Sequence, residues 1–158
     1  MACLKYINIG ELVSLIEVLS SKNLKKLSSI YECIGKEFVS WMKTLHLVRN
    51  TCSHNSNIID ISIKTEPMYR DEWHEFLYMF LNDETMKPTN KLSVILAILK
   101  HFISIINVKY QWKNIYQSID TLCKSDKKAH LLRFKNKSSL RKFKDYRRGS
   151  HYTLKRTN

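Results

Sequence analysis

The sequence has few residues that break helices or form turns. Only 3 Gly and 2 Pro occur among its 158 residues, so few turns are expected. Apolar residues instead recur at steps of three and four through most of the chain, which is typical of amphipathic helices. The length suits a single domain with a buried core. We therefore expect an all-α fold.

The cysteines form no metal or redox motif. Neither a CxxC pair nor a Cys/His zinc spacing occurs. Such wide spacing favours reduced, mostly buried thiols in a cytosolic protein. The four residues concerned are Cys3, Cys33, Cys52 and Cys123.

Neither a signal peptide nor a membrane span is expected from the sequence. Its N-terminus has no basic segment followed by an apolar one. The most apolar stretch, residues 92–108, is interrupted by Lys100 and His101 and predicts a buried core helix. We therefore expect a cytoplasmic protein that does not enter a membrane.

Acidic residues are scarce in the last part of the chain. From residue 124 onward, 13 Lys and Arg stand against Asp126 and Asp145, a net charge of +11, whereas residues 1–123 carry +2. Such a segment attracts polyanions, with nucleic acid the first candidate and anionic membrane the second. A solvated tail that only raises solubility is the plain alternative. We expect a helical domain over residues 1–124 and a basic, partly disordered tail over 125–158.

Hydrophobic periodicity and capping residues predict six helices in the helical domain. A loop is expected over residues 55–63 and a connector over 82–90. Residues 137–148 are compatible with a basic helix formed on binding or with disorder. The six helices are expected at residues 10–19, 24–33, 36–53, 71–81, 91–108 and 110–123.

The stretch Arg49-Asn50-Thr51-Cys52-Ser53-His54 ends the third predicted helix. In a regular helix Asn50 and His54 stack on one face, whereas Arg49 and His54 lie roughly 140° apart around the axis. One phosphate is within reach of both only if the helix unwinds near Ser53 or a second copy of the chain completes the site. The inner stripe of this helix is expected to be Phe38, Trp41, Leu45, Val48 and Cys52.

An arginine and a histidine are sufficient to cleave RNA without a metal. The neighbouring 2′-hydroxyl is the nucleophile, a histidine moves the proton, and an arginine stabilises the charged phosphorane. Asn50 is suited to orienting the histidine or a phosphate oxygen. Arg-His pairs at this spacing are common by chance, so the polar end of a core helix is the alternative explanation.

Four stretches of the chain carry a family resemblance. They are the opening LVSLIEVLSSKNLKKLSSIY, the tryptophan helix FVSWMKTLHLV, the signature RNTCSHNSNIID, and the pair PTNKLSVILAILKHFISI and QWKNIYQSI. In this order they resemble the bacterial Abi-like family, which acts in abortive infection and phage resistance. The resemblance covers roughly residues 10–124.

The resemblance implies a HEPN-like helical bundle and a metal-independent endoribonuclease that needs no cofactor. In that superfamily an R-x(4–6)-H motif marks the active site, and two motifs face each other in a dimer. Carried over by position, Arg49, Asn50 and His54 are the catalytic residues. RNA and a second copy of the chain are the expected partners, and a regulatory RNA or an antitoxin is a further candidate. The expected role is phage defence or toxicity.

The chain departs from the family pattern in four ways. The family often has a second histidine where Asn55 stands and an arginine where Asn57 stands, and the aromatic residue near the end of the family signature is Ile in this chain. An upstream helical segment that members usually carry is absent, so we expect a short member or the C-terminal piece of a longer one. These departures bear on catalytic rate and substrate gripping, and the Arg49/His54 pair itself is retained.

The basic tail supplies the predicted RNA contacts. Phe134, Phe143 and Tyr146 are interleaved with its basic residues, and this pattern suits either RNA contact or docking of the tail onto the domain. The predicted RNA-binding residues are Lys135, Lys137, Arg141, Lys142, Lys144, Arg147 and Arg148.

Other polar and aromatic residues are expected to be structural. The acidic cluster around His74 (Asp71, Glu72, His74 and Glu75) indicates a solvated helix start rather than a metal site. We expect His46 on the surface, with a supporting role at the site as the alternative, and His101 in the core or an interface. The aromatic side chains expected in the core are Trp41, Trp112 and Tyr116.

Two rival functions remain open from the sequence. One is a non-catalytic RNA-binding or protein-interaction module on the same helical scaffold. The other is a membrane-surface protein that uses the basic tail. RNA binding that is sensitive to salt and indifferent to His54 is expected of the first rival.

Overall fold

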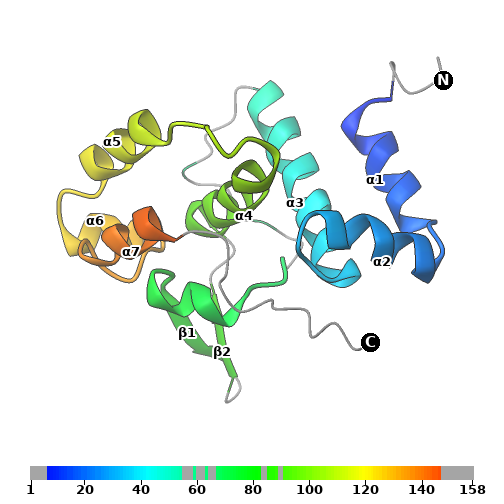
Figure 1. Ribbon diagram of the computed structural model, residues 1–158. Helices are drawn as coiled ribbons and strands as arrows, with labels where there is room; N and C mark the ends of the chain where they lie inside the picture. Colours follow the sequence, from blue (N-terminus) through cyan, green and yellow to red (C-terminus); the bar gives the residue numbers. More distant parts are fainter. Residues whose placement is uncertain are drawn as a thin grey trace. The chain divides into compact units, whose positions relative to one another are not determined.

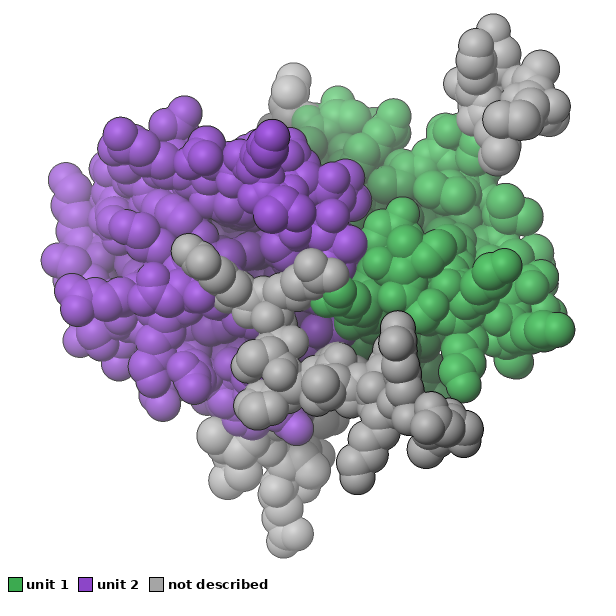
Figure 2. Space-filling view, viewed as in Figure 1, with its two compact units in different colours: residues 1–68 green, residues 69–158 purple. Residues whose placement is uncertain are grey.

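The computed structural model describes residues 7–54, 59, 63, 67–82, 85–88 and 91–146, and it is helical apart from one small sheet (Figure 1). The predicted all-α fold class is confirmed. The chain divides into two compact units, residues 1–68 and residues 69–158 (Figure 2). The sequence placed the division between residues 124 and 125 instead.

The described part of unit 1 contains three helices, α1 (Ile9–Glu17), α2 (Ser21–Ile30) and α3 (Gly35–Ser53). The three helices predicted for this region are confirmed within three residues at each end. Helices α1 and α2 both pack against α3. Trp41 of α3 is fully buried, and its indole N–H donates to the Met68 carbonyl at 2.6 Å. It is therefore a core residue, as predicted.

Local capping fixes where α1 and α3 begin. The Asn8 side chain accepts the backbone N–H of Glu11 at 3.0 Å, and the Glu11 carboxylate accepts the N–H of Asn8 at 2.9 Å, which is a capping box. At the start of α3, the carboxylate of Glu37 accepts the N–H of Ile34 at 3.0 Å. These bonds satisfy donors that a helix start otherwise leaves open.

Unit 2 is built around α4 (Leu92–Ile106), which is followed by α5 (Lys113–Leu122). Both confirm predicted helices. The residues of α4 that form the core are Val94, Ile95, Ala97, Ile98 and Phe102. Within the described residues, none of the helices combines the length and the apolar character that crossing a membrane requires. The predicted buried core helix is thus found.

The predicted helix over residues 71–81 is wrong. A 3₁₀ helix, η2 (Asp71–Glu75), is followed by strand β1 (Met79–Asn82), which pairs antiparallel with β2 (Thr85–Pro88) in the predicted connector. Between η2 and β1, Leu77 makes an isolated bridge with Phe134, and the N–H of Tyr78 donates to the Arg133 carbonyl at 2.9 Å. These long-range backbone bonds are incompatible with a helix there.

Residues 126–145, which the sequence analysis assigns to a tail, contain two further helices. They are α6 (Asp126–Leu131) and α7 (Ser139–Asp145). Ala129, Phe134 and Phe143 of this segment are almost completely buried in unit 2. From the sequence, residues 137–148 were compatible with either a helix or disorder. In the structure, residues 139–145 are helical.

Candidate functional site

Helix α3 carries the predicted catalytic residues at its C-terminal end. Arg49 and His54 are exposed and Asn50 is half-buried. The helix is regular through Ser53, and the N–H of His54 still donates to the Asn50 carbonyl at 3.2 Å. Unwinding near Ser53, one of the two arrangements considered from the sequence, is therefore not found.

Asn50 joins two other side chains of α3. A guanidinium N–H of Arg49 donates to Asn50 Oδ1 at 3.1 Å. The amide Nδ2 of Asn50 donates in turn to His46 Nε2 at 3.0 Å. An amide suits this position because it offers an acceptor and a donor at once. The chain of bonds runs Arg49, Asn50, His46.

His46 is the site residue that the sequence analysis did not favour, since it was expected on the surface. It is half-buried and bonded to Asn50. A methyl group at Gly10 of α1 would lie 3.0 Å from two atoms of the His46 ring, so this glycine leaves the space that the ring occupies. The available signal was spacing, because residues 46, 50 and 54 are four apart and share one helix face.

The hydrogen bonds through Asn50 change where the Arg49 guanidinium lies relative to His54. Helix geometry separates their Cα directions by roughly 140°. The bond to Asn50 draws the Arg49 guanidinium toward the face that also bears His54, one turn further on. Within residues 7–54, no hydrogen bond joins the Arg49 and His54 side chains. A guanidinium and an imidazole are thus exposed on neighbouring parts of one helix end, and both can approach a phosphate.

The cysteines agree only in part with the sequence prediction. Cys33, Cys52 and Cys123 are free thiols, and Cys33 and Cys123 are buried as expected. Burial, and then the Asp120 carboxylate, raises the pKa of the Cys123 thiol to about 11. Cys52 was predicted on the inner stripe of α3 but is exposed, because the last turn of the helix extends beyond the core.

Five of the predicted RNA-binding residues are described, and all five are exposed. They are Lys135, Lys137, Arg141, Lys142 and Lys144. Lys142 forms an ion pair with Glu75 at 3.5 Å. Arg147 and Arg148 lie outside the described residues, as do Asn55 and Asn57. The exposed basic side chains come from the α6–α7 segment, which is folded against the rest of unit 2.

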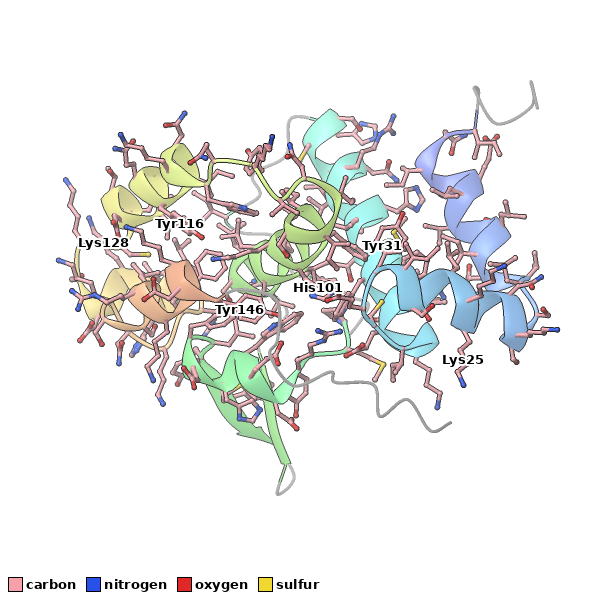
Figure 3. All side chains as sticks on the ribbon, in the orientation of Figure 1. Lys25, Tyr31, His101, Tyr116, Lys128 and Tyr146 are labelled. Carbon is pink, nitrogen blue, oxygen red and sulfur yellow. The ribbon has the colours of Figure 1, made fainter. Side chains whose placement is uncertain are left out.

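Trp112 and Tyr116 are not the core residues that the sequence predicted. Both are half-buried, and both line a cavity of about 460 Å³ in unit 2. Tyr116 (labelled in Figure 3) accepts a hydrogen bond from the ammonium of Lys100 and donates to the Lys144 carbonyl at 3.2 Å. Burial, and then the Asp145 carboxylate, raises the pKa of Tyr116 to about 12.

The acidic cluster around His74 makes structural contacts within unit 2. The Glu72 carboxylate accepts from the Tyr146 hydroxyl at 2.9 Å and lies 3.8 Å from the Arg70 guanidinium. Across the described ranges, no group of three His, Cys, Asp or Glu side chains is placed to hold a metal ion. His101 is fully buried in α4 and 3.5 Å from Arg70, so it is a core histidine with a polar partner.

Comparison with known proteins gives one match. Residues 1–60 match the model of a family described as Abi-like protein. The match includes α1, α2 and α3, and with them Gly10, His46 and the stretch 49–54. No curated protein and no solved structure matches the chain. The resemblance drawn from the sequence for residues 61–124 stays a prediction.

Proposed function

We propose that this protein is a metal-independent endoribonuclease of the HEPN type that acts in phage defence, by abortive infection, or as a toxin. The Abi-like match over residues 1–60 supports this role because it spans the whole of α3. The observation that carries the proposal is the bonded series Arg49, Asn50 and His46, one helical turn from an exposed His54.

The proposed reaction is transesterification within RNA. His54 removes the proton from a 2′-hydroxyl, and the 2′-oxygen attacks the adjacent phosphorus. Arg49 stabilises the extra negative charge on the phosphorane. The P–O5′ bond then breaks, and the leaving oxygen takes a proton. The products are a 2′,3′-cyclic phosphate and a 5′-hydroxyl, so neither water nor a metal is needed for this step.

A second copy of the chain completes the proposed site. The reaction needs a base on one side of the phosphorus and an acid on the other, and two copies of His54 supply both. A two-fold dimer brings two identical helix ends together. Unit 1 also exposes Leu15, Val18 and Ile30, apolar side chains that association can cover.

The exposed lysines and arginines of the α6–α7 segment hold RNA in this proposal. The segment keeps a large excess of positive charge, because from residue 124 to 146 nine Lys and Arg stand against Asp126 and Asp145. Contacts of this kind recognise phosphates without reading sequence.

Cleavage of RNA by the purified protein in EDTA tests the proposal. We expect cleavage of an RNA oligonucleotide and none of its all-2′-deoxy counterpart. We expect His54→Ala and Arg49→Ala each to lower the rate by at least about 100-fold, since proton transfer by the histidine and charge stabilisation by the arginine each contribute about that much. Circular dichroism melts control for folding. Cleavage rates equal to wild type in the folded variants would contradict the proposal and favour a non-catalytic RNA-binding module.

Mixing wild-type protein with the His54→Ala variant tests the composite site. The proposed reaction uses His54 of both copies, so a mixed dimer lacks either the base or the acid. In an equal mixture about a quarter of the dimers are fully wild type, so we expect about a quarter of the activity of an all-wild-type sample. About half of that activity, in a mixture that size-exclusion chromatography shows to be dimeric, would place a complete site in each chain.

A further inference from the structure

Unit 2 contains an aromatic cavity with a basic rim. Its volume is about 460 Å³, and its aromatic lining is Tyr110, Trp112, Tyr116 and Tyr146. The rings of Tyr110 and Trp112 meet edge to face with centroids 5.5 Å apart, and those of Trp112 and Tyr116 lie 6.1 Å apart. Tyr110 is 42% exposed. The rings therefore form a continuous series that solvent reaches at one end.

The cavity wall is held in place by the core. The buried ammonium of Lys100 donates to the Tyr116 hydroxyl and to the carbonyls of Phe143, at 2.6 Å, and Lys144, at 2.8 Å. On the other side, the Asn107 side chain accepts the N–H of Lys109 at 3.2 Å and shapes the loop that carries Tyr110. The aromatic surface is thus built before any ligand arrives, which lowers the entropy lost on binding.

The charges around the cavity favour an anionic ligand. Lys100 and Lys144 line it, and its described lining contains no carboxylate. The ammonium of Lys144 lies 6.0 Å from the centre of the Tyr116 ring. A planar aromatic group and a neighbouring negative charge on one ligand would satisfy both features.

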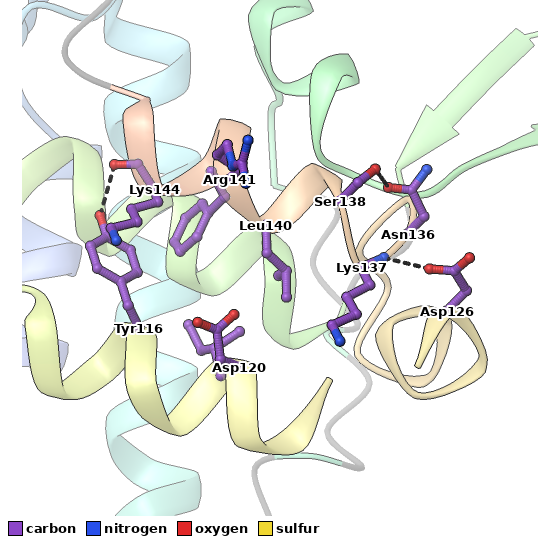
Figure 4. Close-up of a pocket in the computed structure, with 11 residues that line it drawn as sticks. Tyr116, Asp120, Asp126, Asn136, Lys137, Ser138, Leu140, Arg141 and Lys144 are labelled. Carbon is purple, nitrogen blue, oxygen red and sulfur yellow. Dashed lines mark hydrogen bonds between the residues drawn. The ribbon is translucent and has the colours of Figure 1, made fainter. Parts of the chain in front are cut away.

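A second cavity continues from the first along α7. It has a volume of about 740 Å³ and shares Tyr116 and Lys144 with the aromatic cavity. Figure 4 shows Lys137 and Lys144 at opposite ends of it, with Asp120 of α5 across from α7. Asp126 also lines it, and this carboxylate accepts the backbone N–H of Lys137 at 2.8 Å. The Lys137 and Arg141 side chains extend the basic surface away from the rings.

We propose that the aromatic cavity binds one unstacked base of a single-stranded RNA, with the adjoining phosphates against Lys144 and then along Arg141 and Lys137. The ligand's identity as RNA rests on the proposed function. Bases stack on aromatic side chains whatever their sequence, and a basic groove follows the backbone. A paired duplex keeps its bases stacked inside, so single strands are preferred. The site thus grips the substrate in unit 2 while cleavage takes place at α3.

Binding of a fluorescein-labelled single-stranded RNA octamer, measured by anisotropy with full-length His54→Ala protein, tests the inference. We expect Tyr110→Ala and Trp112→Ala each to weaken binding on the order of tenfold, the usual contribution of one stacked base. Tyr110→Phe keeps the ring and should bind as the parent does. Phe80→Ala is the matched control, because Phe80 is 40% exposed in the same unit and lines neither cavity.

Quenching of tryptophan fluorescence by RNA separates base stacking from an effect of misfolding. Trp41 and Trp73 are fully buried, so Trp112 is the tryptophan that a base can reach. We expect RNA to quench the emission and an abasic octamer of equal charge to do so far less. Tight binding of the abasic octamer, or unchanged affinity in folded Tyr110→Ala and Trp112→Ala proteins, would overturn the inference.

The two proposals fail separately. Stacking and quenching without any cleavage by the wild-type protein would uphold the cavity as an RNA site and sink the nuclease. Cleavage that depends on His54 while the aromatic variants bind RNA normally would uphold the nuclease and sink the cavity.

Discussion

Asn50 is the residue on which the candidate site depends most. Its carbonyl oxygen accepts from Arg49 and its amide nitrogen donates to His46. The acceptor role of His46 Nε2 requires that nitrogen to be unprotonated, which places the proton of the neutral ring on Nδ1. The site is therefore oriented from α1 outward, since Gly10 leaves the space for His46, His46 holds Asn50, and Asn50 holds Arg49.

Replacing Asn50 with Leu removes both roles at a similar side-chain size. An apolar side chain neither accepts from Arg49 nor donates to His46. We expect Asn50→Leu to lower kcat about tenfold with little change in thermal stability, because one partly exposed hydrogen bond contributes only about 1 kcal/mol. Steady-state kinetics at pH 7 provide the measurement.

Cys52→Ser, an exposed change in the same turn, is the matched control and should keep the wild-type kcat. An Asn50→Leu variant as active as wild type would show that Asn50 orients nothing.

At the scale of elements, the segment from Asp71 to Pro88 shows how periodicity misleads. Trp73, Phe76 and Leu77 are buried at steps of three and one, which fits a helix as well as a 3₁₀ turn entering a strand. Aromatic and bulky residues from Tyr78 onward favour a strand. The choice is made by backbone groups of Arg133 and Phe134, more than fifty residues away.

Helix α7 depends on one buried cation. Seven residues make a helix that is marginal by itself. The Lys100 ammonium donates to the carbonyls of Phe143 and Lys144 at its C-terminal end, where a positive charge also opposes the helix dipole. The basic side chains of α7 therefore owe their fixed positions to a residue of α4.

Lys100→Met tests that dependence. The substitution keeps an apolar stem of similar length but leaves the two carbonyls without this donor. We expect a loss of about 2 kcal/mol in the free energy of unfolding, within the range for unpaired buried groups. We also expect faster amide hydrogen exchange over residues 139–146. Lys113→Met, an exposed change on α5, should alter neither, and protected amides in α7 of the Lys100→Met variant would contradict the dependence.

For the whole molecule, RNA binding should depend more on where the charges lie than on the net charge. The net charge is +13, but residues 1–123 contribute only +2 of it. Exposed lysines of unit 1, such as Lys25 and Lys26, are accompanied by acidic residues elsewhere in that unit. RNA affinity should therefore depend on the basic residues of unit 2.

The salt dependence of RNA binding tests whether the basic residues of unit 2 determine the affinity. For single strands, the slope of log K against log salt falls by about 0.7 for each phosphate contact removed. We expect Lys137→Gln with Arg141→Gln to make the slope shallower by about 1.4. Lys25→Gln with Lys26→Gln removes equal charge from unit 1 and should leave it unchanged. Equal effects of the two pairs would mean that RNA responds only to net charge.

The sequence by itself determined the helical fold, five of its helices and the uneven charge, because periodicity, capping and composition act locally along the chain. It also identified the stretch 49–54 as the candidate site. The tertiary structure decided the partners of those residues. The Asn50–His46 bond needs the space left by Gly10, and the cavity joins rings from residues 110–116 with Tyr146. The space at Gly10 and the grouping of these rings depend on packing between distant segments, which no local pattern encodes.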